Sequence, residues 1–201
     1  MKDVGLISLE APEALGGTEV DTISIAIAME ELGRACGSTA LSIAAHNGLG
    51  CAPLKRWGTP AQHEQWFPKL ISGEVLGALA LTEPGAGSDL RGMKASARPD
   101  GDDWILNGTK HFISHADLAG FAICFMASGE EQTQRGPKKL ITAFFVDKGA
   151  PGFTVRDGYR NVSHRGYTNA VLEFDDCRVP AANVLGEVHK GFEVANSWLG
   201  A

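Results

Sequence analysis

The chain has 201 residues, of which 44% are hydrophobic and 21% charged, a balance that predicts a folded chain and argues against disorder. The net charge of −6 disfavours a non-specific nucleic-acid binder, and the longest apolar run, residues 118–127, is too short to span a bilayer. The four cysteines form no CxxC pair and no signal peptide is visible. We therefore predict neither a metal site nor a disulfide framework, and a reducing compartment.

Residues 1–75 carry apolar side chains at helical spacing and are predicted to form an N-terminal helical domain. Asp21 is suited to cap a helix that runs towards Arg34, because its carboxylate can accept from the first free backbone N–H groups. A second helix is predicted from Ser38 onward. It has almost no charge and is expected to be buried.

A third helix is predicted from Thr59 onward. Thr59 can cap it, Pro60 suits its first position, and Gln62 can reach back as in a capping box. Pro68 and Gly73 are expected to bring it to an end.

Residues 76–186 consist of short β-like apolar runs separated by turn signals, a pattern that predicts an antiparallel β-domain. Residues 77–82 are typical of a buried strand. The dipeptides Asp100-Gly101 and Asn107-Gly108 are hairpin signals, so residues 94–114 are expected to form three antiparallel strands.

Further strands are predicted over residues 119–127, 140–146, 152–156 and 170–174, with residues 129–139 as a solvent-exposed connection. A last helix begins near Gly191 and still runs at Ala201, so residues 187–201 are interpreted as the start of a third domain. Helices followed by strands favour an α+β fold with segregated elements.

The most informative segment runs from Leu79 to Asp89. A buried strand ends there and breaks into a glycine-rich turn, with hydroxyl groups at Thr82 and Ser88. Gly85 and Gly87 lack a Cβ, so the backbone can take φ > 0 and approach a ligand closely. This suits a phosphate or the polar edge of a heteroaromatic ring. On the residues alone, a plain exposed turn fits as well.

Three segments, in this order, resemble the acyl-CoA dehydrogenase family. They are LTEPGAGSD at residues 81–89, NGTKHFIS at residues 107–114, and FDDCRVPAANVLGEVHKGF at residues 174–192. Segments of the helical part, including EELGRACGSTALSIAAHNGLG at residues 30–50, resemble the family too, so the likeness spans nearly the whole chain.

The resemblance implies a fold and a reaction. The fold has an N-terminal helical domain, a middle antiparallel β-barrel-like domain, and a C-terminal four-helix bundle that is missing here, with FAD between them. A Glu removes the α-proton of an acyl-CoA thioester and the β-hydrogen leaves as hydride to the flavin, giving a 2,3-enoyl-CoA. Electrons then pass to an electron-transfer flavoprotein, and the full-length protein is expected to be a homodimer or homotetramer.

The resemblance also assigns residues to the cofactor: Leu79, Leu81, Thr82, Gly87, Ser88, Phe112, Ile113 and Ser114. Ser88 is also expected at the mouth of the acyl-CoA site. Phe112 and Ser114 stand where the family commonly has Trp and Thr, so an apolar ring and a hydroxyl are retained. No catalytic residue is assigned in this chain, because the base Glu is expected downstream of Ala201 and Glu193 is not at the matching position. We therefore expect the chain to be inactive on its own.

Alternatives remain open on the same fold: an acyl-CoA oxidase or related flavin monooxygenase, or a binding module without catalysis. Glu83 and Asp89 are interpreted as structural residues of the turn, in preference to an acid–base pair. His111 and His115, with the same parity on one expected strand, are too far apart to share a metal and are interpreted as surface or packed residues. Cys124 is predicted to be a buried, inert thiol.

Overall fold

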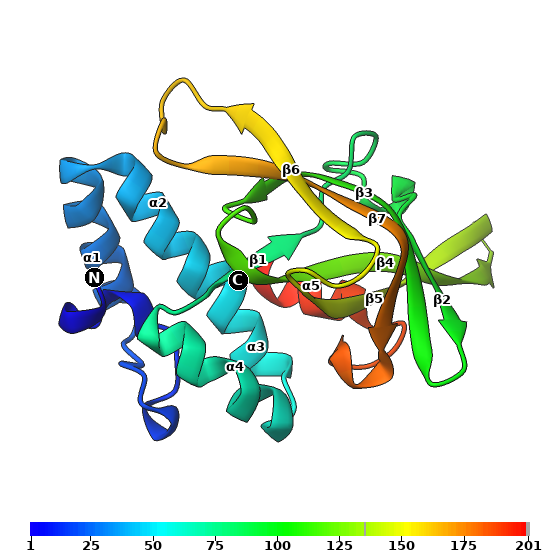
Figure 1. Ribbon diagram of the computed structural model, residues 1–201, viewed down its shortest axis with the longest axis horizontal. Helices are drawn as coiled ribbons and strands as arrows, with labels where there is room; N and C mark the ends of the chain where they lie inside the picture. The colour runs from blue at the N-terminus through cyan, green and yellow to red at the C-terminus, as the bar shows by residue number, and fades with distance from the viewer. Residues whose placement is uncertain (135, 200–201) are drawn as a thin grey trace.

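The computed structural model describes residues 1–134 and 136–199. The N-terminal part is helical, and the rest is a sheet with a further helix packed against it (Figure 1). The helical segments are η1 (Lys2–Val4), η2 (Leu6–Ser8), η3 (Glu13–Leu15), α1 (Thr22–Ala35), α2 (Gly37–Ala45), the π-helical η4 (His46–Cys51), α3 (Ala52–Trp57), α4 (Pro60–Ser72), η5 (Leu90–Gly92), η6 (Ala181–Asn183) and α5 (Gly191–Leu199). The strands are β1 (Leu76–Ala80), β2 (Ser96–Asp100), β3 (Asp103–Ser114), β4 (Ala119–Thr133), β5 (Gly136–Asp147), β6 (Phe153–Arg160), β7 (Thr168–Pro180) and β8 (Val184–Leu185).

Two predicted helix starts are confirmed by their caps. The Asp21 carboxylate accepts from the backbone N–H groups of Ile23 at 2.9 Å and Ser24 at 3.1 Å. Thr59 and Gln62 form the predicted capping box at the start of α4. The last helix begins at Gly191 as expected. Its predicted continuation to residue 201 lies outside the described residues.

The end of α4 is predicted in part. Gly73 caps the helix with a left-handed φ of 69°, as expected, but Pro68 lies inside the helix and does not end it. Phe67 and Leu70, on either side of the proline, are fully buried. Their packing offsets the backbone hydrogen bond that Pro68 cannot donate, so the helix continues for another turn.

The second helix is interrupted. Instead of one continuous helix from Ser38 onward, α2 is followed by the wider turns of η4 and then by α3. The Asn47 side chain donates to the Leu6 carbonyl at 3.1 Å, which fixes this segment to the N-terminal turns. A Cβ on Gly50 would lie 2.9 Å from the Cα of Gly77, so η4 and β1 touch backbone to backbone.

The strands form one sheet in the order β6-β7-β3-β2-β4-β5-β8, with β1 pairing with β4. Most neighbours are antiparallel, as predicted. The β1–β4 pair and the single bridge between β2 and β4 are parallel, because the chain passes through β2 and β3 before β4 returns beside β1.

Two turn predictions are wrong. Asn107 and Gly108 lie inside β3, so residues 94–114 form two strands joined at Gly101, not three. Gly108, with φ 131°, lies where the register with β7 shifts by one residue, and a Cβ there would lie 2.6 Å from the Cα of Ala95. The predicted connection at 129–139 is instead an exposed extension of β4 and β5, whose strands stay paired to Thr133 and Gly136.

Both faces of the sheet are covered. On one face α4 packs against β4 and β5, with the rings of Trp66 and Phe121 centred 4.5 Å apart, and α5 adds Val194 to this cluster. The other face forms a second core that includes Leu106 and Leu172. In Figure 1 the helices α1–α4 lie at one end of the sheet and α5 lies behind β4 and β5.

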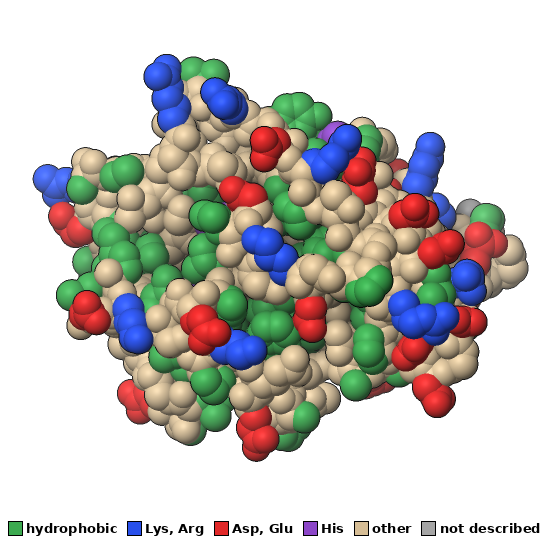
Figure 2. Space-filling view, viewed as in Figure 1, with side chains coloured by type: hydrophobic (Ala, Val, Ile, Leu, Met, Phe, Trp, Pro, Cys, Tyr) green, Lys and Arg blue, Asp and Glu red, His purple; other side chains and the backbone are tan. Residues whose placement is uncertain are grey.

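The surface follows the same division. On the face shown in Figure 2, hydrophobic side chains gather over the helical half and its junction with the sheet, while charged side chains crowd the strand-rich end. Among the described residues, no helix is long and apolar enough to cross a membrane. The same residues include no group of three or more His, Cys, Asp or Glu side chains placed to hold a metal ion.

Candidate functional site

The eight residues singled out from the sequence line one open cavity of about 400 Å³. The cavity lies where the end of β1, the glycine-rich turn and the end of β3 meet. Its lining consists of Leu49, Leu79, Leu81, Thr82, Gly87, Ser88, Leu90, Phe112, Ile113 and Ser114. Leu49 and Leu90 are the two that sequence reasoning missed, because Leu49 comes from the helical part and Leu90 lies one residue beyond the glycine-rich segment.

One wall is the chain leaving β1. Leu79 is buried, while Leu81 and Thr82 follow the last residue of the strand and are half-buried. The Thr82 carbonyl accepts from the backbone N–H of His111 at 2.8 Å. This bond fastens the end of β1 to β3 and places the two walls on the same side of the molecule.

The glycine-rich turn forms the rim. Glu83 and Ala86 exchange backbone hydrogen bonds of 2.9 and 3.3 Å, which close the turn. Neither Gly85 nor Gly87 uses the positive φ that glycine permits. A Cβ at position 87 would meet no atom of this chain within 4 Å, so this position faces the open space of the cavity.

The opposite wall is the bulged end of β3. The register with β7 shifts between Lys110 and Ile113, and Phe112 has φ 57°. The shift buries Ile113 and leaves Phe112 with 52% of its surface exposed. The Phe112 ring stacks on Tyr159 of β6, with centroids 4.5 Å apart and an interplanar angle of 26°. The bulge therefore presents an aromatic face at the cavity.

Ser114 ends the wall and connects it to buried polar groups. Burial raises the pKa of the Tyr167 phenol, and a hydrogen bond to Ser114 opposes that rise. The prediction that His115 lies on the strand is wrong, because His115 directly follows the last residue of β3. It has φ 35°, is buried, and packs edge-on against Tyr167 with centroids 4.9 Å apart. His115 is thus a packed residue.

A buried ion pair lies directly beneath these walls. The Lys110 ammonium contacts the Glu83 carboxylate at 2.8 Å, and both side chains are almost completely buried. Glu83 is therefore a structural residue of the turn, as predicted. Lys110 was not singled out from the sequence. Its position could have indicated burial, because Lys110 is four residues from Leu106 on the same strand and its side chain therefore points to the same, buried face.

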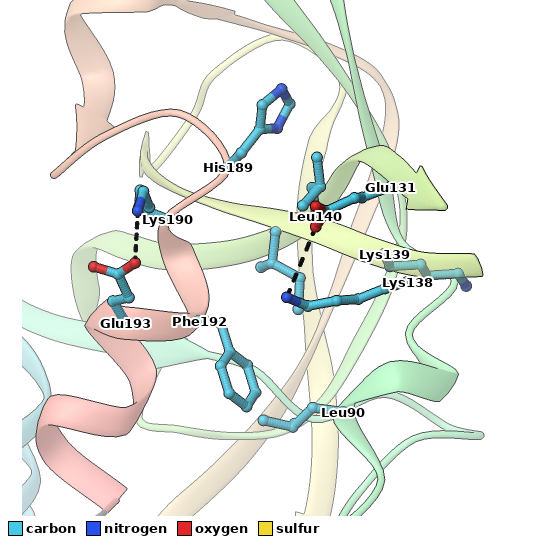
Figure 3. A pocket seen from close by; sticks show the side chains of 10 residues that line it. Leu90, Glu131, Lys138, Lys139, Leu140, His189, Lys190, Phe192 and Glu193 are labelled. Atoms are coloured by element: carbon cyan, nitrogen blue, oxygen red, sulfur yellow. Dashed lines mark hydrogen bonds and ion pairs between the residues drawn. The ribbon is translucent and has the colours of Figure 1, made fainter. Parts of the chain in front are cut away.

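A second cavity of about 310 Å³ adjoins the first, and Leu90 lines both. Its lining includes Lys138, Lys139 and Lys190, and Figure 3 shows Phe192 and Leu90 together at one side of the cavity, with Lys190 beside Glu193 at another. Lys138 pairs with Glu131 at 3.9 Å and Lys190 with Glu193 at 2.9 Å. The sequence did not predict this cavity, because the residues come from the β4–β5 extension and the start of α5.

Cys124 is fully buried in β4, and burial raises the pKa of its thiol far above the ordinary value, so it is inert as predicted.

The sequence model of the acyl-CoA dehydrogenase N-terminal domain matches residues 1–74, and that of the middle domain matches residues 78–177. The chain belongs to the acyl-CoA dehydrogenase family. It is 42% identical over 193 residues to the probable acyl-CoA dehydrogenase YngJ of Bacillus subtilis, covering 96% of this chain and 50% of that protein. It is 38% identical to the human mitochondrial short-chain specific acyl-CoA dehydrogenase, covering 97% of this chain and 46% of that protein. The chain thus spans about half the length of these relatives.

Solved structures agree with this membership. Butyryl-CoA dehydrogenase from Megasphaera elsdenii superposes with a TM-score of 0.89 at 34% identity, covering 98% of this chain and 52% of that one. An acyl-CoA dehydrogenase complexed with FAD from Bacillus anthracis has a TM-score of 0.88 at 32% identity, covering 98% of this chain and 33% of that one. The prolyl acyl carrier protein oxidase AnaB has a TM-score of 0.86 at 31% identity, covering 98% of this chain and 52% of that one. The predicted helical and β architecture is that of the family.

Proposed function

We propose that this chain forms the flavin-facing part of an FAD-dependent acyl-CoA dehydrogenase, which converts acyl-CoA thioesters to 2,3-enoyl-CoA and passes electrons to an electron-transfer flavoprotein. The observation that supports this most is the single cavity lined by all eight residues assigned to the cofactor. We assign no residue of this chain as the base Glu. We place the protein in the bacterial cytoplasm or mitochondrial matrix, as a homo-oligomer when complete.

The cavity has the chemical character that a flavin ring requires. Leu79, Leu81 and Ile113 offer apolar contacts to a flat ring, and Phe112 adds an aromatic face. Hydroxyl groups at its margin can bond the polar edges of the ring. The FAD bound by the Bacillus anthracis relative supports this choice of cofactor. When bound, FAD supplies the hydride acceptor.

The residues of this chain orient the reactants and exclude water. Thr82 and Ser114 both line the cavity, and each has a hydroxyl group that can donate to the polar atoms of a bound ring. Ser88, on the turn, can bond a phosphate or the thioester portion of the substrate. Ile113 is buried in the core and also lines the cavity, so it offers a fixed apolar contact to a bound ring.

We assign the second cavity to the phosphates of coenzyme A. It carries three lysines, Lys138, Lys139 and Lys190, against two carboxylates, and it opens beside Leu90 at the edge of the first cavity. The excess of ammonium groups favours an anionic ligand.

The test is titration of the purified chain with FAD. Binding is expected to quench flavin fluorescence and shift the visible absorption bands. Ser114→Ala and Thr82→Val are expected to weaken FAD binding about tenfold each, because each removes a hydrogen bond to the cofactor. Thr154→Val, an exposed hydroxyl on β6, is the matched control and should bind like the wild type. The absence of any spectral change with the wild type would contradict the proposal.

Activity offers a second check. The chain with added FAD is expected to form no enoyl-CoA from acyl-CoA, since it supplies no base at the proposed site. Enoyl-CoA formation by this 201-residue chain would show that a residue within it acts as the base.

An oxidase is the second candidate, and the similarity to AnaB favours it. The two functions differ in how the reduced flavin reacts with O₂. The holoenzyme is reduced without air, and air is then admitted. Slow reoxidation is expected for the dehydrogenase, and fast reoxidation with release of peroxide would instead support the oxidase.

A further inference from the structure

The buried ion pair between Glu83 and Lys110 lies at the centre of the segments that form the first cavity. The side chain of Lys110 is 0% exposed and that of Glu83 4% exposed, with 2.8 Å between the ammonium and carboxylate. A pair removed from water in this way is costly, because the lost hydration of both charges offsets most of their attraction. Its presence therefore calls for a role beyond filling the core.

The role is visible in the other partners of the pair. The Glu83 carboxylate also accepts from the backbone N–H groups of Lys94 at 2.6 Å and Ala95 at 3.1 Å. The Lys110 ammonium also donates to the Leu81 carbonyl at 3.2 Å. Glu83 thus closes residues 83–95 into a loop, and Lys110 joins that loop to β3 and to the chain leaving β1.

Each of these three segments carries cavity residues. Thr82 follows the carbonyl that Lys110 holds, Gly87 and Ser88 lie within the closed loop, and Phe112 follows Lys110 by two positions. We propose that Glu83 and Lys110 are positioning residues, a clamp that fixes the spacing of the three walls to accept the flavin. This inference rests on the proposed function and adds residues that do not touch the cofactor themselves.

The two charges depend on each other. Burial lowers the pKa of Lys110, and the hydrogen bond that its ammonium donates to Glu83 opposes that fall. An apolar pair could fill the same volume. It could not satisfy the Leu81 carbonyl or the amides of Lys94 and Ala95, so the walls would lose directional contacts even in a stable core.

The first experiment uses the chain without flavin and compares Glu83→Met, Lys110→Met and the double variant, in which neither side chain can bond its former backbone partners. Each single change leaves one buried charge unpaired and is expected to lower the melting temperature. The double change removes both charges and is expected to recover most of that loss. Amide hydrogen exchange of residues 83–95 is expected to stay faster than wild type in the double variant. Glu173→Gln, in the exposed pair with Arg156, is the control and should leave this exchange unchanged.

Wild-type exchange of residues 83–95 in the double variant would overturn the clamp, and so would equal acceleration by Glu173→Gln. A second readout is the FAD dissociation constant, expected to rise about tenfold in the double variant although its melting temperature is close to that of the wild type. Wild-type FAD affinity in the double variant would overturn the positioning role. If the wild type itself binds no FAD, the proposed function fails, and hydrogen exchange still decides whether the clamp exists.

Discussion

Phe112 shows how a single residue can be held in an unfavourable backbone state at a site. Its φ of 57° is costly for an aromatic residue, and the surrounding bulge and the stack on Tyr159 maintain it. The resemblance predicted that an aromatic ring stands here. It could not predict the Tyr159 ring that stacks on it, because Tyr159 lies 47 residues further along the chain and meets Phe112 only in the fold.

Tyr159→Ala is expected to free the Phe112 ring and weaken FAD binding about threefold to tenfold, the value of one aromatic stack. Fluorescence titration with FAD measures this. Tyr159→Phe is the matched variant, since it keeps the stack and loses only the hydroxyl contact to His111 at 3.4 Å. It is expected to bind FAD like the wild type, and an equal loss in both variants would mean that the hydroxyl matters instead of the stack.

The buried His46 side chain is expected to make the free energy of unfolding depend on pH. It is fully buried in η4, and burial, with repulsion from His115, lowers its pKa to about 4. The unfolded chain binds a proton near pH 6.5 and the folded chain does not until about pH 4. Stability is therefore complete above pH 6.5 and falls as the pH drops towards 4, by at most about 3 kcal/mol from this residue.

Urea unfolding between pH 4.5 and 7.5 measures this dependence. His46→Gln is expected to flatten the curve, although its stability at pH 7 will be lower because a packed ring is lost. His63→Gln, another histidine of the helical part that is only half-buried, is the control. A wild-type slope in His46→Gln would assign the pH dependence to other groups.

At the scale of the elements, the sequence predicted what neighbouring residues decide. Asp21 and Thr59 cap their helices through atoms two or three positions away, so the signal is local. Pro68 and Asn107-Gly108 were misread because distant packing overrides the local preference. Phe67 and Leu70 hold α4 together past the proline, and β7 pairs with β3 on both sides of the glycine.

Gly108 gives a test at this scale. Gly108→Ala is expected to destabilise the fold by about 2–4 kcal/mol, because the new Cβ would meet the Ala95 backbone at 2.6 Å and the φ of 131° is unsuited to alanine. Urea denaturation measures the change. Gly101→Ala is the control. Its φ of 65° is also left-handed, yet its Cβ would meet no atom within 4 Å, so only about 1–2 kcal/mol is expected. Equal losses would show that the close approach to β2 does not matter.

At the scale of the whole molecule, the candidate site lies at the junction of the helical part and the sheet. Leu49 reaches the first cavity from η4, while the other lining residues come from the β part. The family resemblance predicted the lining residues that belong to sequence motifs, because each motif forms one continuous stretch of the cavity lining. Leu49, Leu90 and the lysine-lined second cavity depend on how distant elements meet, which no local pattern in the sequence records.

That junction depends on two glycines whose backbones touch. A Cβ on Gly50 would lie 2.9 Å from the Cα of Gly77, so Gly50→Ala must push η4 away from β1. This displacement is expected to move Leu49 away from the cavity that it lines together with Leu79. We expect a loss of stability of about 1–3 kcal/mol together with weaker FAD binding, measured by urea denaturation and flavin fluorescence. Gly48→Ala is the control in the same segment, because its Cβ would meet no atom within 4 Å. It should leave FAD binding unchanged. Lost stability with unchanged FAD affinity in Gly50→Ala would mean that the β part alone forms the flavin wall, without the helical part.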